Sequence, residues 1–399
     1  MTPNPPMPST ENEISISGRY IVPPIIKEHG PVVVFIGGIH GNEPAGVLAL
    51  KQLLLELGDI SDKVLGSVYG LVGNKAALRE GKRFNEVDLN RIWTAEAVEQ
   101  SNSDGIFENE YKEQLELWAC LNQIVERHDG PFYFMDLHTT SAPTVPFMTV
   151  NDSLLNRSFT SNYPLPVVLG IEEYLEGPLL SYINSLGYVA FGFEAGQHED
   201  QLSVQNCYDF AVLSLRITGI LEEKTCDCSK HRARLGEQTD KLEQFYEITY
   251  RHAIRDRESF DLRPGYKNFQ VIEAGEILGY EGKQILITET DTQLFMPLYQ
   301  GQGEDGYFLI QPIPKFFLRL SKWLRKYRLD RLLPLLPGVY WKDPSKAQLR
   351  VNLRIARFLT VPLLHLFGYR KKDHGESELL ITNREAASRT ADYKKAPWY

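Results

Sequence analysis

The sequence has few cysteines and no long uninterrupted apolar run. Four cysteines in 399 residues are too few to build a disulfide framework. Two of them, Cys120 and Cys207, lie in amphipathic helical patterns and are interpreted as buried thiols. No run approaches the roughly eighteen apolar residues that a membrane-spanning helix needs, so no transmembrane segment is expected. We also find no internal repeat.

The first twenty residues, Met1–Tyr20, contain no apolar run with basic residues beside it. They are rich in Pro, Ser, Thr and Asn instead, so a secretory signal is not expected, and residues 1–20 are predicted to form a flexible N-terminus. The expected location is therefore the cytoplasm.

The other two cysteines form a Cys226-Asp-Cys228 pair, which His231 follows. These side chains could in principle hold a metal, but the further cysteine that would complete a zinc site is absent. A polar loop after a helix is the favoured interpretation.

Charge is distributed unevenly along the chain, whose net charge is −9. Residues 315–372 contain fifteen Lys and Arg but only two acidic residues, so the remainder of the chain carries about −22. An acidic body does not favour nucleic acid as a partner, and we expect none. With 43% hydrophobic and 24% charged residues, the composition is typical of a folded soluble protein.

Short apolar runs alternate with longer segments of helical period from Pro31 to about Leu221. This alternation predicts an α/β fold with a mostly parallel, doubly wound sheet that helices cover on both faces. The expected strands are 31–36, 64–72, 132–137, 145–150 and 188–193, and the expected helices are 45–57, 107–127, 171–185 and 202–221.

We assign the α/β domain to residues 21–235. The residue pattern changes after it. Residues 245–314 contain short β-prone runs broken by Gly and Pro, and they are predicted to form a small all-β domain. Residues 315–371 have apolar residues at helical spacing with Lys and Arg between them, and they are predicted to form a basic helical extension interrupted by prolines. The polar residues 372–399 are expected to form a loose tail.

His40 and Glu43 stand three residues apart after the predicted strand 31–36, where open α/β sheets place their ligand sites. His138 follows the predicted strand 132–137 and can converge with them because both strands end at the same edge. Two histidines and one carboxylate, with a fourth position left for water, are the arrangement expected of catalytic zinc. We therefore expect one Zn²⁺ per chain.

A metal-activated water needs a group that takes its proton and delivers it to the leaving amine. Glu194 stands at the end of the predicted strand 188–193, where it could do so. Its small or apolar neighbours would favour a raised carboxyl pKa if the site is dry. The alternative is an ordinary glutamate that caps the next helix.

Two arginines, Arg83 and Arg91, lie with Asp88 and Asn90 in a short stretch that has no obvious helix. Arginine is suited to a bidentate grip on a carboxylate, and one arginine could stabilise the oxyanion of a tetrahedral intermediate. The alternative is surface ion pairing with Glu86 and Asp88, which would contribute little.

Four motifs follow one another in order: Gly37-Gly-Ile-His-Gly-Asn-Glu43, Asp88-Leu-Asn-Arg91, Asp136-Leu-His138 and Glu194. Together they resemble the succinylglutamate desuccinylase/aspartoacylase family, which is related to zinc carboxypeptidases. The resemblance covers about residues 32–196, and it implies a sheet of the zinc carboxypeptidase type. The all-β segment 245–314 fits the C-terminal domain that such enzymes usually carry.

The resemblance also implies a role for individual residues. His40, Glu43 and His138 would bind zinc. Glu194 would act as general base and then as general acid, and Arg83 would polarise the scissile carbonyl.

Further residues would contact the substrate by the same resemblance. Asn90 and Arg91 would hold its carboxylate. The family's C-terminal domain tends to supply a tyrosine to the pocket, for which Tyr307 is the candidate; a tyrosine packed in the core is the alternative.

The sequence departs from the family in two respects. Aspartoacylases carry a further arginine upstream of the catalytic glutamate, whereas residues 181–193 contain none and Asn184 stands near that place. Specificity for acetylaspartate therefore does not carry over. The basic segment 315–371 lies outside the family pattern and could dock on the acidic body, on a partner or on an anionic membrane face.

These observations favour a zinc-dependent hydrolase that cleaves the amide bond of a small N-acyl amino acid or a related anionic substrate, with zinc-bound water as the nucleophile and Glu194 as base and acid. A peptidase or esterase that uses the same site is a second hypothesis, because zinc chemistry does not select the acyl group. A third is a non-enzymatic binding protein that acts through its basic C-terminal helices. A homo-oligomer is left open.

Overall fold

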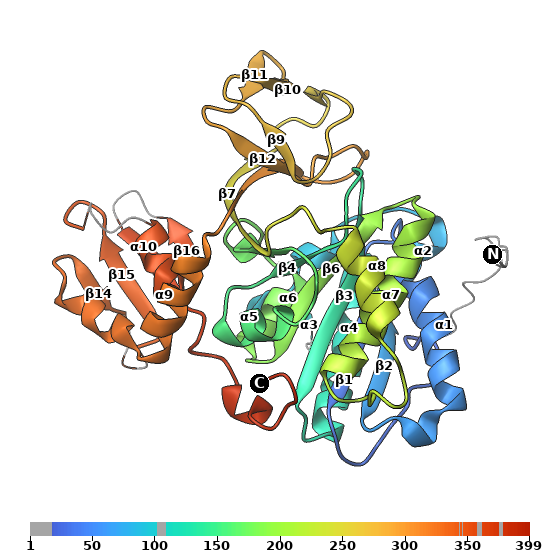
Figure 1. Cartoon of the computed structure of the whole chain (residues 1–399). Coiled ribbons are helices and arrows are strands. Elements are labelled where there is room, and N and C mark those ends of the chain that lie inside the picture. The colour runs from blue at the N-terminus through green and yellow to red at the C-terminus, as the bar shows by residue number, and fades with distance from the viewer. Residues whose placement is uncertain (1–17, 102–108, 343, 345, 357–360, 375–377) are drawn as a thin grey trace.

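The computed structural model describes residues 18–101, 109–342, 344, 346–356, 361–374 and 378–399. Figure 1 shows an α/β domain, a β-rich region above it and a lobe of C-terminal residues beside it. The last residues of the chain return from this lobe to the α/β domain. Within the described ranges, no helix combines the length and the apolar character needed to cross a membrane.

A ten-stranded sheet runs through the α/β domain into the β-rich region, in the order β2-β1-β3-β6-β4-β5-β7-β13-β12-β9. Strands β2, β1, β3 and β6 are parallel, whereas β4 is antiparallel to β6 and parallel to β5. The sheet of the α/β domain is therefore mostly parallel, as predicted. Its strands are β1 Val32–Gly37, β2 Ser67–Val72, β3 Phe132–Thr140, β4 Phe147–Val150, β5 Val167–Leu169 and β6 Val189–Gln197.

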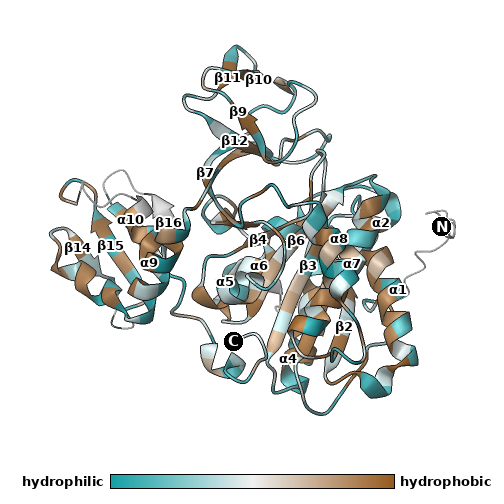
Figure 2. Ribbon diagram, viewed as in Figure 1, coloured by the Kyte–Doolittle hydropathy of each residue, from teal (hydrophilic) through white to brown (hydrophobic). Residues whose placement is uncertain are grey.

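All six residues of β1 are buried, and their side chains alternate between two cores. Val33 and Phe35 belong to the core on one face, and Val32, Val34 and Ile36 to the core on the other. A strand buried on both faces requires helices on both sides of the sheet, which confirms the doubly wound arrangement. In Figure 2 the helices carry both apolar and polar residues, consistent with one buried and one exposed side.

The helices divide between these two cores. The first core receives residues of α1 Ala45–Asp59, α5 Leu154–Thr160, α7 Gln201–Ile217 and α8 Ser229–Glu237. The second receives residues of α3 Ala95–Ser101, α4 Asn109–Arg127 and α6 Leu179–Ser185. The short α2, Lys75–Glu80, follows β2.

The helix predicted at 171–185 forms only in its second half, as α6. Gly177 has a positive φ of 67° and Pro178 is the N-cap of α6, so the chain cannot continue as one helix through this point. Ile171–Glu173 forms a separate short 3-10 helix, η3. Strand β5 was not predicted, because three residues are too few to show a period.

Residues 245–312 are rich in strands, which confirms the all-β character predicted for 245–314. The strands are β7 Phe245–Ala253, β8 Phe260–Leu262, β9 Gln270–Ile272, β10 Ile277–Glu281, β11 Gln284–Ile287, β12 Thr292–Phe295 and β13 Asp305–Pro312. Strand β7 pairs in parallel with β5, so the large sheet continues from one part into the other. Strands β11, β10 and β8 form a small sheet of their own.

The C-terminal lobe, residues 315–399, is not the helical extension and loose tail that the sequence suggested. After α9 Lys315–Lys326 come a 3-10 helix, η4 Leu329–Leu335, and a four-stranded antiparallel sheet with α10 Val361–Leu366. The strands are β14 Val339–Trp341, β15 Gln348–Asn352, β16 Tyr369–His374 and β17 Glu378–Asn383.

The correction has a physical reason. Prolines interrupt the helical pattern, and Leu349 and Val351 alternate with polar neighbours, which is the period of a strand. The buried residues Leu379 and Ile381 are likewise two positions apart. These four apolar side chains are buried in a small core of the lobe. The helical assignment therefore holds for α9, the 3-10 helix η4 and α10 but is wrong for β14, β15 and β16.

The last residues of the chain pack on the α/β domain. The buried Tyr393 hydroxyl donates to the carbonyl of Phe132 at 2.5 Å and accepts from the amide of Val189 at 3.0 Å. The indole of Trp398 donates to the Tyr133 hydroxyl at 2.9 Å. The end of the segment predicted to be a tail is thus fixed against β3 and β6.

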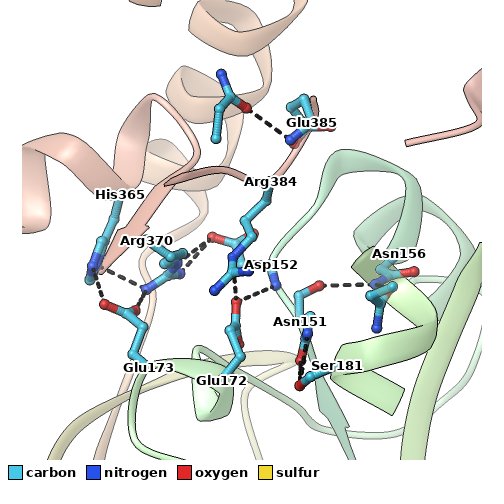
Figure 3. A network of polar contacts seen from close by, with 12 residues as sticks. Asn151, Asp152, Asn156, Glu172, Glu173, Ser181, His365, Arg370, Arg384 and Glu385 are labelled. Carbon is cyan, nitrogen blue, oxygen red and sulfur yellow. Dashed lines mark hydrogen bonds and ion pairs between the residues drawn. The ribbon is translucent and has the colours of Figure 1, made fainter. Parts of the chain in front are cut away.

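A buried network of charges joins the C-terminal lobe to the α/β domain, and Figure 3 shows the part of it around Asp152, Glu173 and Arg370. The carboxylate of Asp152, just after β4, forms ion pairs with three guanidinium groups. The N···O distances are 2.5 Å to Arg157 of α5, 2.9 Å to Arg325 of α9 and 2.5 Å to Arg370 of β16. Burial alone would raise the pKa of Asp152, but the three arginines hold it well below its usual range. The network therefore remains ionised, and Asp152 cannot lose these partners without leaving buried cations unpaired.

Glu173 forms the second half of this junction. Its carboxylate binds Arg370 at 2.6 Å and His365 at 3.1 Å. Beside it, Glu172 accepts from the amide of Asp152 at 3.0 Å and lies 3.5 Å from Arg384. The lobe thus binds the segments that follow β4 and β5.

Protonation of Glu173 should weaken the junction. Burial would raise the pKa of Glu173, but Arg370 and then His365 lower it to about 2, whereas an unfolded glutamate has a pKa of about 4.3. A group with a depressed pKa stabilises the fold above its unfolded pKa, and that stabilisation is lost as the pH falls to the folded value. The difference in unfolding free energy between wild type and Glu173→Gln should therefore shrink as the pH falls from about 4.5 to about 2.

Denaturant unfolding at a series of pH values measures this difference. Glu223→Gln is the control, because the carboxylate of Glu223 is exposed and its pair with Arg216 contributes little. A difference for Glu173→Gln that stays constant down to about pH 3 would contradict the assignment.

Candidate metal centre and active site

The carboxyl ends of β1, β3 and β6 meet at one edge of the sheet and border a cavity of about 420 Å³. His40 and Glu43 enter it from the loop after β1, His138 from the end of β3 and Glu194 from the end of β6. Strands β3 and β6 are adjacent, with His138 paired in register with Glu194. The four residues predicted from separate motifs are therefore brought together.

Three buried side chains, His40, Glu43 and His138, present ligand atoms that all lie within 4.8 Å of one another. The Nδ1 atom of His40 is 2.8 Å from one carboxylate oxygen of Glu43, and the Nδ1 atom of His138 is 3.0 Å from the other. Two imidazoles and one carboxylate form the donor set of a catalytic zinc site.

The opposite nitrogen of each imidazole faces a carboxylate. The Nε2 atom of His40 lies 3.2 Å from Asp88, and the Nε2 atom of His138 lies 2.8 Å from Asp136. A proton held on each Nε2 leaves the Nδ1 lone pair free for a metal, and a carboxylate partner makes the imidazole a stronger ligand. The residues present therefore fit a bound zinc ion.

Sequence reasoning did not assign these two carboxylates a role. Asp136 stands two residues before His138 in a strand that is otherwise apolar, and Asp88 belongs to the motif that ends at Arg91. An acidic residue inside a buried strand is the signal that could have identified Asp136.

Electrostatics at the cluster also suit a cation. Burial would raise the pKa of Glu43, but His40 and His138 hold it well below its usual range. Burial likewise opposes ionisation of Asp88, whose pKa His40 and Arg83 keep well below normal. Glu43 and Asp88 are therefore negative at neutral pH, which suits a divalent ion.

Glycines allow the loop that carries His40 and Glu43 to fold so tightly. Gly38 has a φ of +66°, which side chains rarely adopt. A Cβ on Gly41 would lie 2.1 Å from the backbone carbon of Ala77. The glycines of this motif are thus required by backbone conformation and close approach.

Glu194 is buried in the same cavity. Burial raises its pKa to about 8; the charge of His138 opposes this rise, whereas Glu43 and Asp136 add to it. Glu194 is not a helix cap, since α7 begins at Gln201 and its N-cap is Asp200. A carboxyl that can hold or release a proton near neutral pH is suited to general acid and base chemistry.

Arg83, Asn90 and Arg91 also line the cavity, and the pairing of Arg83 with Asp88 that the alternative expected occurs in its largely buried wall. Arg83 lies 3.0 Å from Asp88 and 3.5 Å from Glu43. Arg91 binds Asp305 at 2.9 Å. The side-chain oxygen of Asn90 accepts from the amide of Leu179 at 2.9 Å, which ties it to the start of α6.

The loop between β12 and β13 closes the cavity from the β-rich region. Its Gln300 lies 3.1 Å from His198, and its Gln302 accepts from the amide of Arg83 at 3.2 Å and donates to the carbonyl of Phe84 at 3.0 Å. His198 and Asp305 also line the cavity and were missed by sequence reasoning. Both face it only because distant segments pack together.

Tyr307 and the Cys226-Cys228-His231 group, both considered from the sequence, lie outside the cavity. Tyr307 does not line the cavity. It is buried in the core of the β-rich region, and its ring stacks on that of His252 with the centroids 5.1 Å apart. Neighbouring residues of a strand face opposite sides, and here Phe308 faces the cavity.

The Cys226, Cys228 and His231 side chains, which could in principle hold a metal, do not form such a site. The Nδ1 atom of His231 lies 2.6 Å from Asp209, and Cys226 and Cys228 are free thiols. Within the described residues, the one cluster suited to a metal is the one at His40.

The mostly parallel sheet that carries this cluster has a fold of the zinc carboxypeptidase type. Two solved structures share the fold. Succinylglutamate desuccinylase from Vibrio cholerae has a TM-score of 0.51 and 17% identity, covering 71% of this chain and 82% of that one. A succinylglutamate desuccinylase/aspartoacylase from Rhodobacter sphaeroides has a TM-score of 0.52 and 17% identity, covering 73% of this chain and 88% of that one.

Sequence comparison shows a similarity to one family over part of the chain. Residues 29–217 match the family model described as the succinylglutamate desuccinylase/aspartoacylase catalytic domain. The succinylglutamate desuccinylase of Pseudomonas paraeruginosa (strain DSM 24068 / PA7) is 32% identical over 123 residues, which are 31% of this chain and 35% of that protein. That of Pseudomonas fluorescens (strain Pf0-1) is 33% identical over 84 residues, 21% of this chain and 25% of that protein.

Residues 29–217 are therefore similar to the catalytic domain of the succinylglutamate desuccinylase/aspartoacylase family. The aligned segments span about a quarter to a third of the length of these curated relatives.

Proposed function

We propose that this protein is a zinc-dependent hydrolase that cleaves the amide bond of a small N-acyl amino acid. The observation that carries the proposal is the arrangement of the two imidazoles. In each, Nε2 contacts a carboxylate and Nδ1 faces Glu43, and the buried Glu194 lies beside them. His40, Glu43 and His138 would hold one Zn²⁺. A bound zinc ion would polarise the scissile carbonyl and make water acidic enough to react near neutral pH.

The remaining residues act around the reacting bond. Glu194 takes a proton from water and delivers it to the departing amine, for which a pKa of about 8 is suited. Arg83 stabilises the negative charge that develops on the carbonyl oxygen. Asn90 and Arg91 hold the carboxylate of the substrate.

Small substrates are favoured over polypeptides. The cavity is closed on one side by the loop from the β-rich region, through the contacts of Gln300 and Gln302. Its volume of about 420 Å³ matches a small molecule. This enclosure supports a deacylase over a peptidase that uses the same groups.

The proposal extends to the organisation and the location of the protein. We place the α/β domain at residues 21–235 and the β-rich region at 245–314, followed by the C-terminal lobe. The four cysteines are free, which supports a reducing compartment such as the cytoplasm.

Glu194→Gln should retain zinc and lose turnover, because the amide fills the same volume but cannot accept the proton. We expect kcat to fall by about 10²- to 10⁴-fold. Zinc content and hydrolysis of N-acyl amino acids are measured on one preparation, with Glu223→Gln as the control for an exposed glutamate. A Glu194→Gln enzyme with near wild-type kcat would refute the role.

Asp136→Asn should weaken zinc binding without removing a ligand, since Asn can still accept from Nε2 of His138 but brings no charge. We expect a loss of about 10- to 100-fold in zinc affinity. Competition with a chelator measures it, beside His138→Ala, which should lose the metal, and His29→Ala, an exposed histidine that should not matter. Unchanged affinity in Asp136→Asn would show that the carboxylate does not support the ligand.

A further inference from the structure

The cavity has few positive charges for a substrate to use. Arg83 and Arg91 are the only lysine or arginine residues among the described residues that line it, and each is already paired with an aspartate. Six carboxyl groups line the same cavity: Glu43, Glu86, Asp88, Glu194, Glu304 and Asp305. With Arg83 assigned to the carbonyl oxygen and Arg91 to the substrate carboxylate, no lysine or arginine among the lining residues remains for a second carboxylate.

The position of Asn90 indicates which part of the substrate lies against the side of the cavity that α6 borders, which we call the inner wall. Its side chain binds the amide of Leu179, so a carboxylate held by Asn90 and Arg91 lies beside the first turn of α6. The next residues of that turn, Leu180 and Ser181, line the cavity. In this arrangement a side chain on the carbon next to that carboxylate would lie near Leu180 and Ser181.

The inner wall is uncharged. It contains the apolar side chains of Ile171, Leu175, Leu180 and Phe191 together with Thr149, Asn151 and Ser181. Asn151 donates to Ser181 at 3.1 Å, and Ser181 donates back to Asn151 at 3.3 Å, as Figure 3 shows. Because these polar groups satisfy each other, the wall presents a neutral and largely apolar surface.

The arginines behind this wall are also engaged. Arg157, Arg325 and Arg370 bind Asp152, Arg370 also binds Glu173, and Arg384 lies beside Glu172. Arg370 is fully buried, and none of the four lines the cavity. They cannot serve as counter-ions for a substrate without abandoning buried carboxylates.

We propose that the amino-acid part of the substrate has an uncharged, largely apolar side chain, such as that of leucine, methionine or phenylalanine, and not that of aspartate or glutamate. This inference rests on the proposed function, because it takes Asn90 and Arg91 as the carboxylate site. A carboxylate against the inner wall would be desolvated without a partner, which a site of this kind rejects strongly.

Binding to the zinc-loaded Glu194→Gln protein tests the inference without turnover. Calorimetry should show that N-acetyl-leucine binds at least about tenfold more tightly than N-acetylaspartate. Equal or tighter binding of N-acetylaspartate, or no measurable binding of N-acetyl-leucine at millimolar concentration, would overturn it. Failure of the proposed hydrolysis looks different: zinc-loaded wild type would turn over neither compound while the preference in binding persists.

Two matched variants locate the determinant. Leu180→Arg places a cation in the inner wall and should reverse the preference toward N-acetylaspartate. Leu186→Arg makes the same change just after α6, where the leucine is exposed and outside the cavity, and should leave the preference as it is. Reversal in both variants, or in neither, would contradict this location of the wall.

An independent observation concerns the exposed side of α9. Phe316, Leu320, Trp323 and Tyr327 are spaced four, three and four residues apart, so they form one stripe along the helix and its end. Phe316 is 67% exposed, Trp323 52% and Tyr327 59%, and the last two rings are 5.5 Å apart.

A second stripe of the same spacing consists of Lys315, Arg319, Lys322 and Lys326, all of them exposed. No ion pair to any of these four occurs within the part of the chain that the structure describes. The opposite side of α9 carries Ser321 and Arg325, which are buried at the junction with Asp152. The two stripes therefore point away from the body of the protein.

We infer that α9 docks on an anionic lipid surface. Exposed aromatic side chains beside unpaired cations suit the boundary between headgroups and acyl chains, where both are satisfied at once. A symmetric contact between two copies through α9 would bring the cationic stripes together, which disfavours self-association through this side.

Co-sedimentation of the full chain with vesicles tests this inference. Binding is expected to phosphatidylglycerol vesicles, to be weak for phosphatidylcholine and to fall with salt. The pairs Phe316→Ser with Trp323→Ser and Lys322→Glu with Lys326→Glu should each reduce binding at least about tenfold. Leu55→Ser with Lys63→Glu, exposed residues at the end of α1 and just after it, should not. Equal binding to both lipids, binding to neither, or a wild-type dimer that the α9 variants dissociate would overturn it.

Discussion

The proposed metal centre depends on one constraint: a carboxylate must bind Nε2 of each imidazole so that Nδ1 can face Glu43. Asp88 holds His40 and Asp136 holds His138. Burial makes this arrangement costly unless every charge has a partner, and the depressed pKa values of Glu43 and Asp88 show that the partners are present. The order β1-β3-β6 makes the convergence possible, since it places three strand ends side by side.

The rest of the molecule encloses this centre. Joined to the α/β domain through the β5–β7 pairing, the β-rich region supplies the loop that covers the cavity. The C-terminal lobe contacts the side of the inner wall that faces away from the cavity. Asp152 follows Asn151 in the chain, and Glu172 and Glu173 follow Ile171. The arginines of the lobe therefore bind the segments that form the inner wall. A cavity wall anchored by buried ion pairs is held in place, and its neutral lining can then select the substrate.

Sequence reasoning succeeded where a signal is local. Strand β1 is continuous and apolar, and His40 and Glu43 follow it directly, so both the strand and its ligands could be recognised. It failed where the signal is short or mixed. Strand β5 has three residues, and the lobe after α9 combines prolines and basic residues with strands whose alternation is only a few residues long. Tyr307 was misplaced because the facing of a strand residue depends on register.

The sequence by itself identified the three side chains of the candidate metal centre, because each stands at or just after the end of a recognisable strand and the type of side chain limits what it can bind. Only the tertiary structure decided which carboxylates hold the imidazoles, that Arg91 is paired with Asp305, and that the inner wall is neutral. These features join residues far apart in the chain, such as Asp152 and Arg370, and packing, not local propensity, brings such residues together.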